Sequence, residues 1–237
     1  MTNRPASTTG PMPASLNVTG TDDVAQALHF PLAPGVHAAF LEGGVVFLDL
    51  TRDEYVCIAF ETDALEDLPQ PIIADLADAG ILASIDPGRR RHVQAERRRW
   101  RDQPPMDVSI GCRDVVCFIR ALLITGLRFR GRTVADLLAT AASAKITSPA
   151  VGSAGAVAAR FERMLLFVPF RFRCLFRSYF LTHLLAQYGH RADWIFGVSL
   201  FPFRAHCWLA QGPLLIGEDA SRLLDYVPIL IAQHPSR

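Results

Sequence analysis

The sequence predicts an α+β fold built from two parts in succession. Three short β-prone runs lie between residues 36 and 60 and are separated by glycine-containing or charged turns, which is typical of a small antiparallel sheet. Segments between 112 and 189 repeat apolar residues at helical spacing, and further strand-like runs follow between 193 and 216. A chain of 237 residues with 50% hydrophobic and 20% charged residues can bury a core and exceeds the usual size of one domain. We therefore expect two domains.

Bulk properties exclude several classes of function. The net charge of +1 gives no general attraction to nucleic acid or acidic membranes, so we expect neither as a partner. The longest apolar runs, 115–127 and 227–232, are shorter than the roughly 20 residues that span a bilayer. The five cysteines are scattered and form no CxxC pair, which fits a reducing compartment and gives no structural zinc pattern. We expect a cytoplasmic protein without a metal or other cofactor.

The first predicted sheet has three strands and a helical cover. The runs 36–40 and 45–50 form a hairpin around Gly43 and Gly44, because glycine supplies the positive φ that a tight turn needs. The run 55–60 follows as a third strand. Apolar residues repeat at helical spacing over 72–81, after leucines at 65 and 68. This helix should cover one face of the sheet.

This region resembles a known peptide-binding module. The pattern LAPGVHAAFLEGGVVFLDLTRDEYVCI and the helical segment after it are similar to the RiPP recognition element, a winged-helix domain. The resemblance implies that the leader of a precursor peptide adds a strand to the edge of the third strand and packs against the last helix. The alternative is that the same residues are only a small structural core. The residues expected in the groove are Tyr55, Cys57, Ile58, Ile73 and Leu76.

Composition divides the chain into four segments. Residues 1–24 read as a flexible tail, 25–86 as the recognition element, 87–105 as a linker and 106–237 as the second domain. The linker is arginine-rich, ends in two prolines and is expected to be helical around residues 93–100. A basic run with a tryptophan could bind nucleic acid, but such a run is more often a solvated connector.

The second domain is expected to pack three helices around a fourth. These three helices cover 112–130, 133–144 and 154–166. The fourth begins at Cys174, after Pro169 breaks the preceding helix, and ends before Gly189. Cys112 and Cys117, in the first helix, are expected to be buried inert thiols.

Cys174 and His206 carry the predicted chemistry. A thiol in the first turn of a helix is favoured as a thiolate by the free backbone N–H groups, and the arginines at 171, 173 and 177 add positive field. His206 lies in the strand-like run 204–210, where alternation places Cys207 on the opposite face. A zinc site from Cys174, His183, His206 and Cys207 is therefore disfavoured.

The segment CLFRSYFLTHLLAQYGHRADWIFGVSLFPFRAHCWL resembles the transglutaminase-like (papain-like) cysteine peptidase of lasso-peptide biosynthesis, the B protein. The resemblance implies that Cys174 is the nucleophile and His206 the general base. The third member of the triad is Glu218 by spacing or Asp219 by side-chain length, and the sequence leaves both open. The second donor of the oxyanion hole is also left open.

The two resemblances together imply a leader peptidase. It would bind the leader of a lasso-peptide precursor and cleave it from the core, before a separate asparagine-synthetase-like, ATP-dependent cyclase forms the macrolactam. Two alternatives stay open: a transglutaminase-type acyl transferase, and a non-catalytic adaptor that delivers a peptide to another enzyme.

Overall fold

A computed structural model describes residues 18–19, 32–59, 69–83, 99–143, 146 and 149–233. Several predictions lie outside these residues: most of the tail 1–24, the leucines at 65 and 68, and the linker up to residue 98 with most of its helix. Within the predicted tail, β1 (Val18–Thr19) pairs antiparallel with β8 (Val227–Ala232). These two tail residues thus belong to a sheet.

The first sheet confirms the three predicted strands. Its order is β2-β3-β4, with β2 (Val36–Leu41), β3 (Gly44–Asp49) and β4 (Glu54–Ala59) all antiparallel. Gly43, at φ 82°, makes the turn of the β2–β3 hairpin. The predicted helix is α2 (Gln70–Asp78), which starts with a proline in its first turn and ends before Gly80 at φ 71°. No further element confirms a winged helix in the part of the chain that is described.

The second sheet has the order β1-β8-β5-β6-β7 and is antiparallel throughout. The strands β5 (Asp193–Ser199), β6 (Arg204–Gln211) and β7 (Leu214–Ile216) confirm the strand-like runs predicted between 193 and 216. The sequence prediction missed β8, which pairs with β5. Its residues are almost all buried, so they are uniformly apolar and lack the alternation that marks a half-exposed strand.

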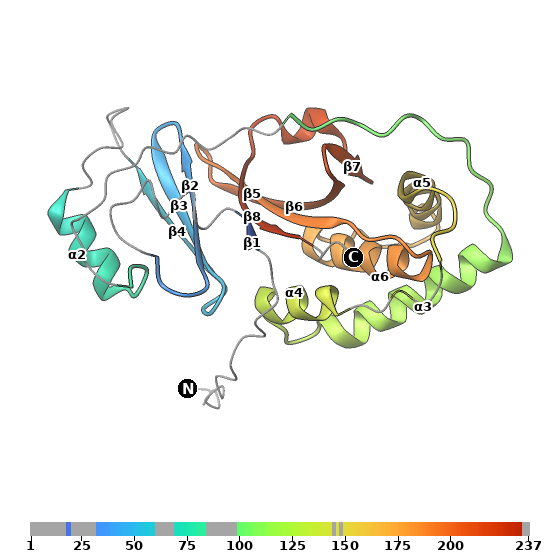
Figure 1. Cartoon of the computed structure of the whole chain (residues 1–237), viewed down its shortest axis with the longest axis horizontal. Helices are drawn as coiled ribbons and strands as arrows, with labels where there is room; N and C mark the ends of the chain where they lie inside the picture. The colour runs from blue at the N-terminus through green and yellow to red at the C-terminus, as the bar shows by residue number, and fades with distance from the viewer. Residues whose placement is uncertain are drawn as a thin grey trace.

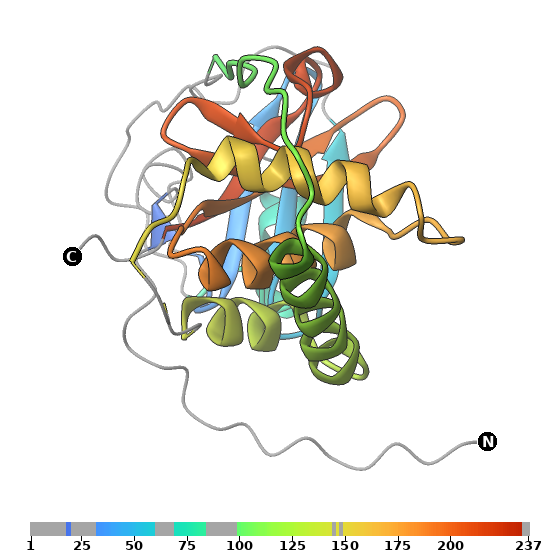
Figure 2. The ribbon, with the colours of Figure 1, turned by 90° about the vertical axis from the view of Figure 1, so that its right-hand side faces the viewer.

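The four predicted helices are present as α3 (Cys112–Phe129), α4 (Val134–Ala142), α5 (Ala154–Leu165) and α6 (Cys174–Gln187). Thr133 and Ser153 cap α4 and α5 through their hydroxyl oxygens. Residues 178–186 of α6 are all buried, so α6 is the central helix. Figures 1 and 2 show α6 between the second sheet and the helices α3 and α4, with α5 running beside it. None of the helices in the described residues is long and apolar enough to cross a membrane.

Helix α3 buries a face that its apolar spacing does not reveal. Phe118, Ala121 and Thr125 point inward, whereas Val116 and Leu123 lie more than half exposed. An apolar pattern on nearly all sides of the helix does not tell which side packs. The prediction of two buried thiols is wrong for the same reason: Cys112 is exposed and Cys117 is half-buried.

The N-terminal sheet and the C-terminal part share one hydrophobic core. Alternation along β2 and β3 sends one set of side chains toward α2 and the other, including Ala39, Val46 and Leu48, into the cluster that holds α6 and the second sheet. The β5–β6 turn adds to this contact, since the Phe203 ring lies 5.5 Å from that of Tyr55. The first sheet is therefore fixed against the part of the molecule that carries Cys174.

Candidate active site

Cys174 is the first residue of α6, as predicted. Arg173 precedes the helix with extended backbone, so the N–H groups of the first turn have no partner within the helix. The thiol is half-buried and lies near His206 and Cys207, which both lower its pKa. A nucleophile held at a helix start with partial access to solvent can be reached by a substrate.

His206 lies on β6 directly opposite Gly197 of β5. A Cβ atom at Gly197 would lie 2.4 Å from Cη2 of Trp208, so the indole occupies the space that a side chain would take. The His206 ring lies beside Trp208 and Tyr226, with ring centroids at 6.0 and 5.6 Å. The glycine and the two aromatic rings thus fix the position of the imidazole.

Glu218 completes the arrangement. Its Oε2 lies 3.0 Å from Nε2 of His206, and only 7% of its side chain is exposed. Gly217, at φ 68°, turns the chain after β7 so that the Glu218 side chain points back to β6. The Asp219 carboxylate instead accepts a hydrogen bond from the backbone N–H of Ser221, at the start of the 3-10 helix η1 (Ala220–Leu223). Of the two candidate acids, Glu218 is the one in contact with His206.

These contacts change the proton affinities of the three groups. Hydrogen bonds from the Cys207 thiol and from His206 lower the pKa of Cys174 to about 4, although burial opposes this. Burial disfavours the charged form of His206, but Cys174 and Glu218 outweigh it and raise the pKa of His206 to about 9. Burial is likewise outweighed at Glu218, where the hydrogen bond with His206 lowers the carboxyl pKa. At neutral pH the site therefore holds a thiolate, an imidazolium and a carboxylate.

The position of Cys207 differs from the prediction. Alternation along β6 was expected to keep Cys207 away from a site that contains His206, yet Cys174 contacts both. Strand β7 pairs only with the far end of β6, from Leu209 onward, so the β6 edge at Cys207 is open. Ser178 of α6 donates to the Cys207 carbonyl oxygen at 3.2 Å. The Cys207 side chain lies on the face against which α6 packs, and Cys174 begins α6, so Cys174 lies near Cys207 as well as His206.

Arg177 ties the nucleophile helix to the loop of the acid. It lies one turn after Cys174, and its Nη2 donates to the Gly217 carbonyl at 2.9 Å and to Glu162 Oε1 at 2.5 Å. Its Nη1 lies 3.8 Å from Oε2 of Glu218. The sequence prediction gave this arginine only a contribution to the local field, because Gly217 follows it by 40 residues and Glu162 precedes it by 15. The structure gives it a positioning role.

Comparison with known families agrees with this geometry. A family model described as "Transglutaminase-like superfamily" matches residues 115–231, which include Cys174, His206 and Glu218. Residues 115–231 form a transglutaminase-like superfamily domain. Members of this superfamily are generally catalytic, as cysteine peptidases or transferases. No curated protein and no solved structure matches the chain.

The residues predicted for a leader groove do not form one group. Ile58, Ile73 and Leu76 belong to the cluster between the first sheet and α2, where Ile73 and Leu76 are buried. Tyr55 and Cys57 alternate with Ile58 along β4 and so lie on the other face of the sheet, where Tyr55 packs toward the transglutaminase-like domain. Burial raises the pKa of Tyr55, with smaller contributions from Cys207, Asp53 and Cys174.

The four residues considered for zinc do not gather around one point. His183 lies farther along α6, with its ring 4.5 Å from that of Tyr179, and burial lowers its pKa to about 4. Within the described ranges, no three His, Cys, Asp or Glu side chains are grouped so as to hold a metal ion.

Proposed function

We propose that the protein is a cysteine peptidase that removes the leader from a ribosomally made lasso-peptide precursor. The observation that supports this best is the contact of Cys174 and Glu218 with the same imidazole, that of His206. A thiolate paired with an imidazolium, which a carboxylate orients in turn, is the arrangement that acyl chemistry on a peptide bond requires.

In the proposed reaction the Cys174 thiolate attacks the carbonyl carbon of the scissile bond. The backbone N–H of Cys174, at the start of α6, lies where it can stabilise the oxyanion. The C–N bond breaks as the His206 imidazolium gives its proton to the leaving amine, which leaves a thioester. His206 then takes a proton from water, the hydroxide attacks the thioester, and the leader leaves with a new carboxylate while the thiolate forms again.

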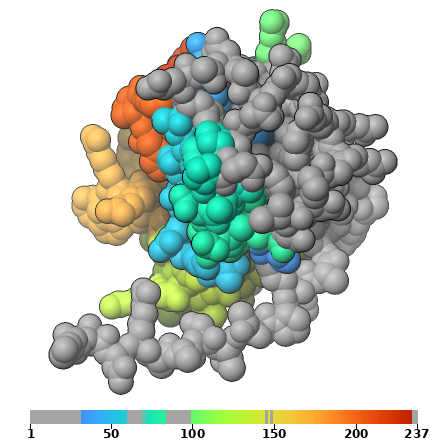
Figure 3. Space-filling view, turned by 90° about the vertical axis from the view of Figure 1, so that its left-hand side faces the viewer, coloured from blue at the N-terminus to red at the C-terminus, as the bar shows by residue number. Residues whose placement is uncertain are grey.

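The first sheet is the proposed binding site for the leader. Strand β4 ends the order β2-β3-β4, so in the described residues no strand pairs with its outer edge. Helix α2 lies on one face of this sheet, and Figure 3 shows it at the surface with β4 beside it. An open edge next to a helix can receive an extended peptide as an additional strand. The free amine of the released core would then pass to a separate ATP-dependent cyclase.

Incubation of the purified protein with its precursor tests the reaction. Mass spectrometry should find two fragments whose masses add to that of the precursor plus water, and Cys174→Ala should form neither. Unchanged cleavage by that variant would refute the proposal. A crosslinked product with loss of ammonia would indicate a transglutaminase-type transfer, and binding without any reaction would indicate an adaptor.

The exposed thiol of Cys57 on β4 gives a separate test of the binding site. A leader strand beside β4 should cover this side chain and slow its reaction with a maleimide. Cys112 is also exposed but lies on α3, so its rate should stay unchanged. Equal rates at Cys57 with and without saturating leader peptide would place the leader elsewhere.

A further inference from the structure

A cavity of about 520 Å³ lies between the end of α5 and the start of α6. Its walls come from Leu165, from the segment that precedes Cys174, and from Arg177. Neither the reaction proposed above nor the leader site on β4 uses this cavity.

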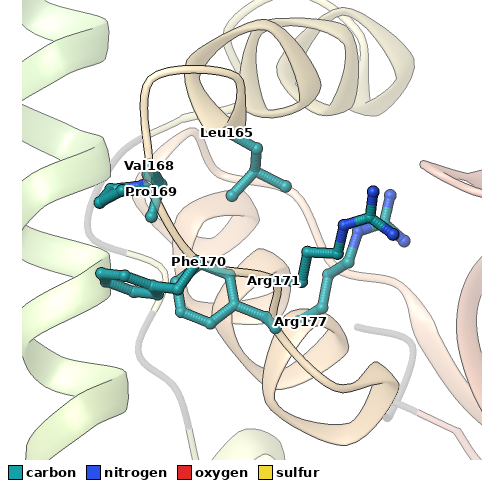
Figure 4. Close-up of a pocket in the computed structure, with 7 residues that line it drawn as sticks. Leu165, Val168, Pro169, Phe170, Arg171 and Arg177 are labelled. Carbon is teal, nitrogen blue, oxygen red and sulfur yellow. The ribbon is translucent and has the colours of Figure 1, made fainter.

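The cavity has an apolar part and a cationic part. Leu165, Val168 and Pro169 line one side, while the guanidinium groups of Arg171 and Arg177 project together on the other (Figure 4). A ligand that fits both parts combines an apolar surface with a negative charge.

The two arginines differ in their partners. The charge of Arg177 is balanced by Glu162 and Glu218. Arg171 is exposed and makes neither a hydrogen bond nor an ion pair with any residue that the structure describes. Because Arg177 is already paired, the charge of Arg171 is the one that an anionic ligand would neutralise. A planar guanidinium binds a carboxylate through two parallel hydrogen bonds.

The cavity lies close to the nucleophile. Arg177 follows Cys174 by three residues on α6, and Arg171 precedes it by three. One helical turn rises about 5 Å and an extended peptide advances roughly 3.3 Å per residue. A peptide held at Cys174 therefore reaches the cavity with a side chain about two or three residues from the scissile bond.

We infer that this cavity is a specificity pocket for an aspartate or glutamate side chain of the peptide substrate, with Arg171 as the residue that selects it. This inference rests on the proposed peptidase function. The carboxylate would bind Arg171, and the neighbouring methylene groups and backbone would lie against Leu165 and Val168.

The test uses precursor peptides in which each of the three residues on either side of the cleavage point is replaced in turn by Glu or by Gln. All peptides carry a C-terminal amide, so that only side-chain carboxylates are compared. At one position, Glu should raise kcat/KM about fivefold or more over Gln, as for a partly exposed charge pair. Arg171→Gln should remove this preference, and Arg171→Glu should reverse it so that Gln is preferred over Glu.

Arg173→Gln is the matched control, because Arg173 is also exposed and directly precedes Cys174 but does not line the cavity. This variant should keep the preference for Glu. A preference that survives in Arg171→Gln, or the lack of any preference in the wild type, would overturn the inference.

Binding measurements separate failure of the pocket from failure of the proposed function. Fluorescence anisotropy with Cys174→Ala reports the Kd of the Glu and Gln peptides without any turnover. A lower Kd for Glu that depends on Arg171 supports the pocket even where the wild type cleaves nothing. Cleavage without a difference in kcat/KM or Kd between Glu and Gln refutes the pocket and leaves the peptidase intact.

Discussion

Nε2 of His206 and Oε2 of Glu218 lie 3.0 Å apart, and the neighbouring Asp219 makes no contact with the imidazole. We predict that Glu218→Gln lowers kcat by about a hundredfold, because the imidazolium loses the charge that stabilises it. The pKa of His206 should fall as well. Asp219→Asn should keep kcat within about twofold of the wild type, because Asp219 only caps η1.

Single-turnover cleavage of the precursor measures both effects, and the ring-proton NMR shifts of His206 report its pKa. A larger loss in Asp219→Asn than in Glu218→Gln would show that the loop after β7 rearranges when substrate binds.

Local sequence patterns were sufficient to place Cys174 at a helix start and His206 on a strand, because helix breaks and strand alternation extend over only a few residues. The choice between Glu218 and Asp219 was not local. It depends on the positive φ of Gly217 and on Arg177, which lies 40 residues earlier and holds the Gly217 carbonyl. The spacing of residues in the sequence reveals neither this backbone conformation nor this hydrogen bond.

The contact between Cys174 and Cys207 was missed for a similar reason. Alternation tells which face of a strand a side chain occupies, but not which end of a helix packs against that face. The edge of β6 is open at Cys207 only because β7 is short, and the length of a partner strand is a property of the whole sheet.

The pH dependence of kcat/KM should be bell-shaped, with limbs near pH 4 and pH 9. The pKa of Cys174 is lowered from 9.0, so the thiolate is lost as the pH falls through about 4. The pKa of His206 is raised from 6.5, so the proton for the leaving amine is lost as the pH rises through about 9. Initial rates between pH 3.5 and 10, with circular dichroism to follow folding, measure both limbs.

The rate of alkylation of Cys174 by iodoacetamide should depend on pH only through the limb near pH 4. Alkylation needs the thiolate but not the imidazolium, so its rate should not fall above pH 9. An alkylation rate that rises only near the ordinary thiol pKa of 9.0 would contradict the thiolate–imidazolium pair.

Arg177→Met should reduce kcat about tenfold or more, as expected for a residue that orients other groups. The variant removes the donor to the Gly217 carbonyl and the partner of Glu162. Arg177→Lys keeps the charge but lacks the fork that reaches both acceptors, so its kcat should recover only in part.

Hydrogen exchange over residues 217–223, followed by mass spectrometry, should be faster in Arg177→Met than in the wild type. Arg160→Met is a control that should leave this segment unchanged, because Arg160 of α5 pairs with Ser109 and with Asp114 of α3 instead. Wild-type exchange in the Arg177 variant would show that the arginine does not hold the loop.

Gly197→Ala should damage both stability and activity, because β5 has no room for a side chain opposite His206. The new Cβ would lie 2.4 Å from Cη2 and 2.6 Å from Cζ3 of Trp208, so the buried indole must move, and His206 lies beside it. Overpacking of this kind costs about 1–3 kcal/mol in the free energy of unfolding.

Gly126→Ala is the matched control, since its Cβ would meet no atom within 4 Å and lies inside α3. That substitution should stabilise the protein by about 0.5–1 kcal/mol, because alanine favours the helix. Urea unfolding of the two variants and the rate of Cys174 alkylation at pH 7 measure the difference. If Gly197→Ala unfolded and reacted like the wild type, the contact between Gly197 and Trp208 would not be what holds His206 in place.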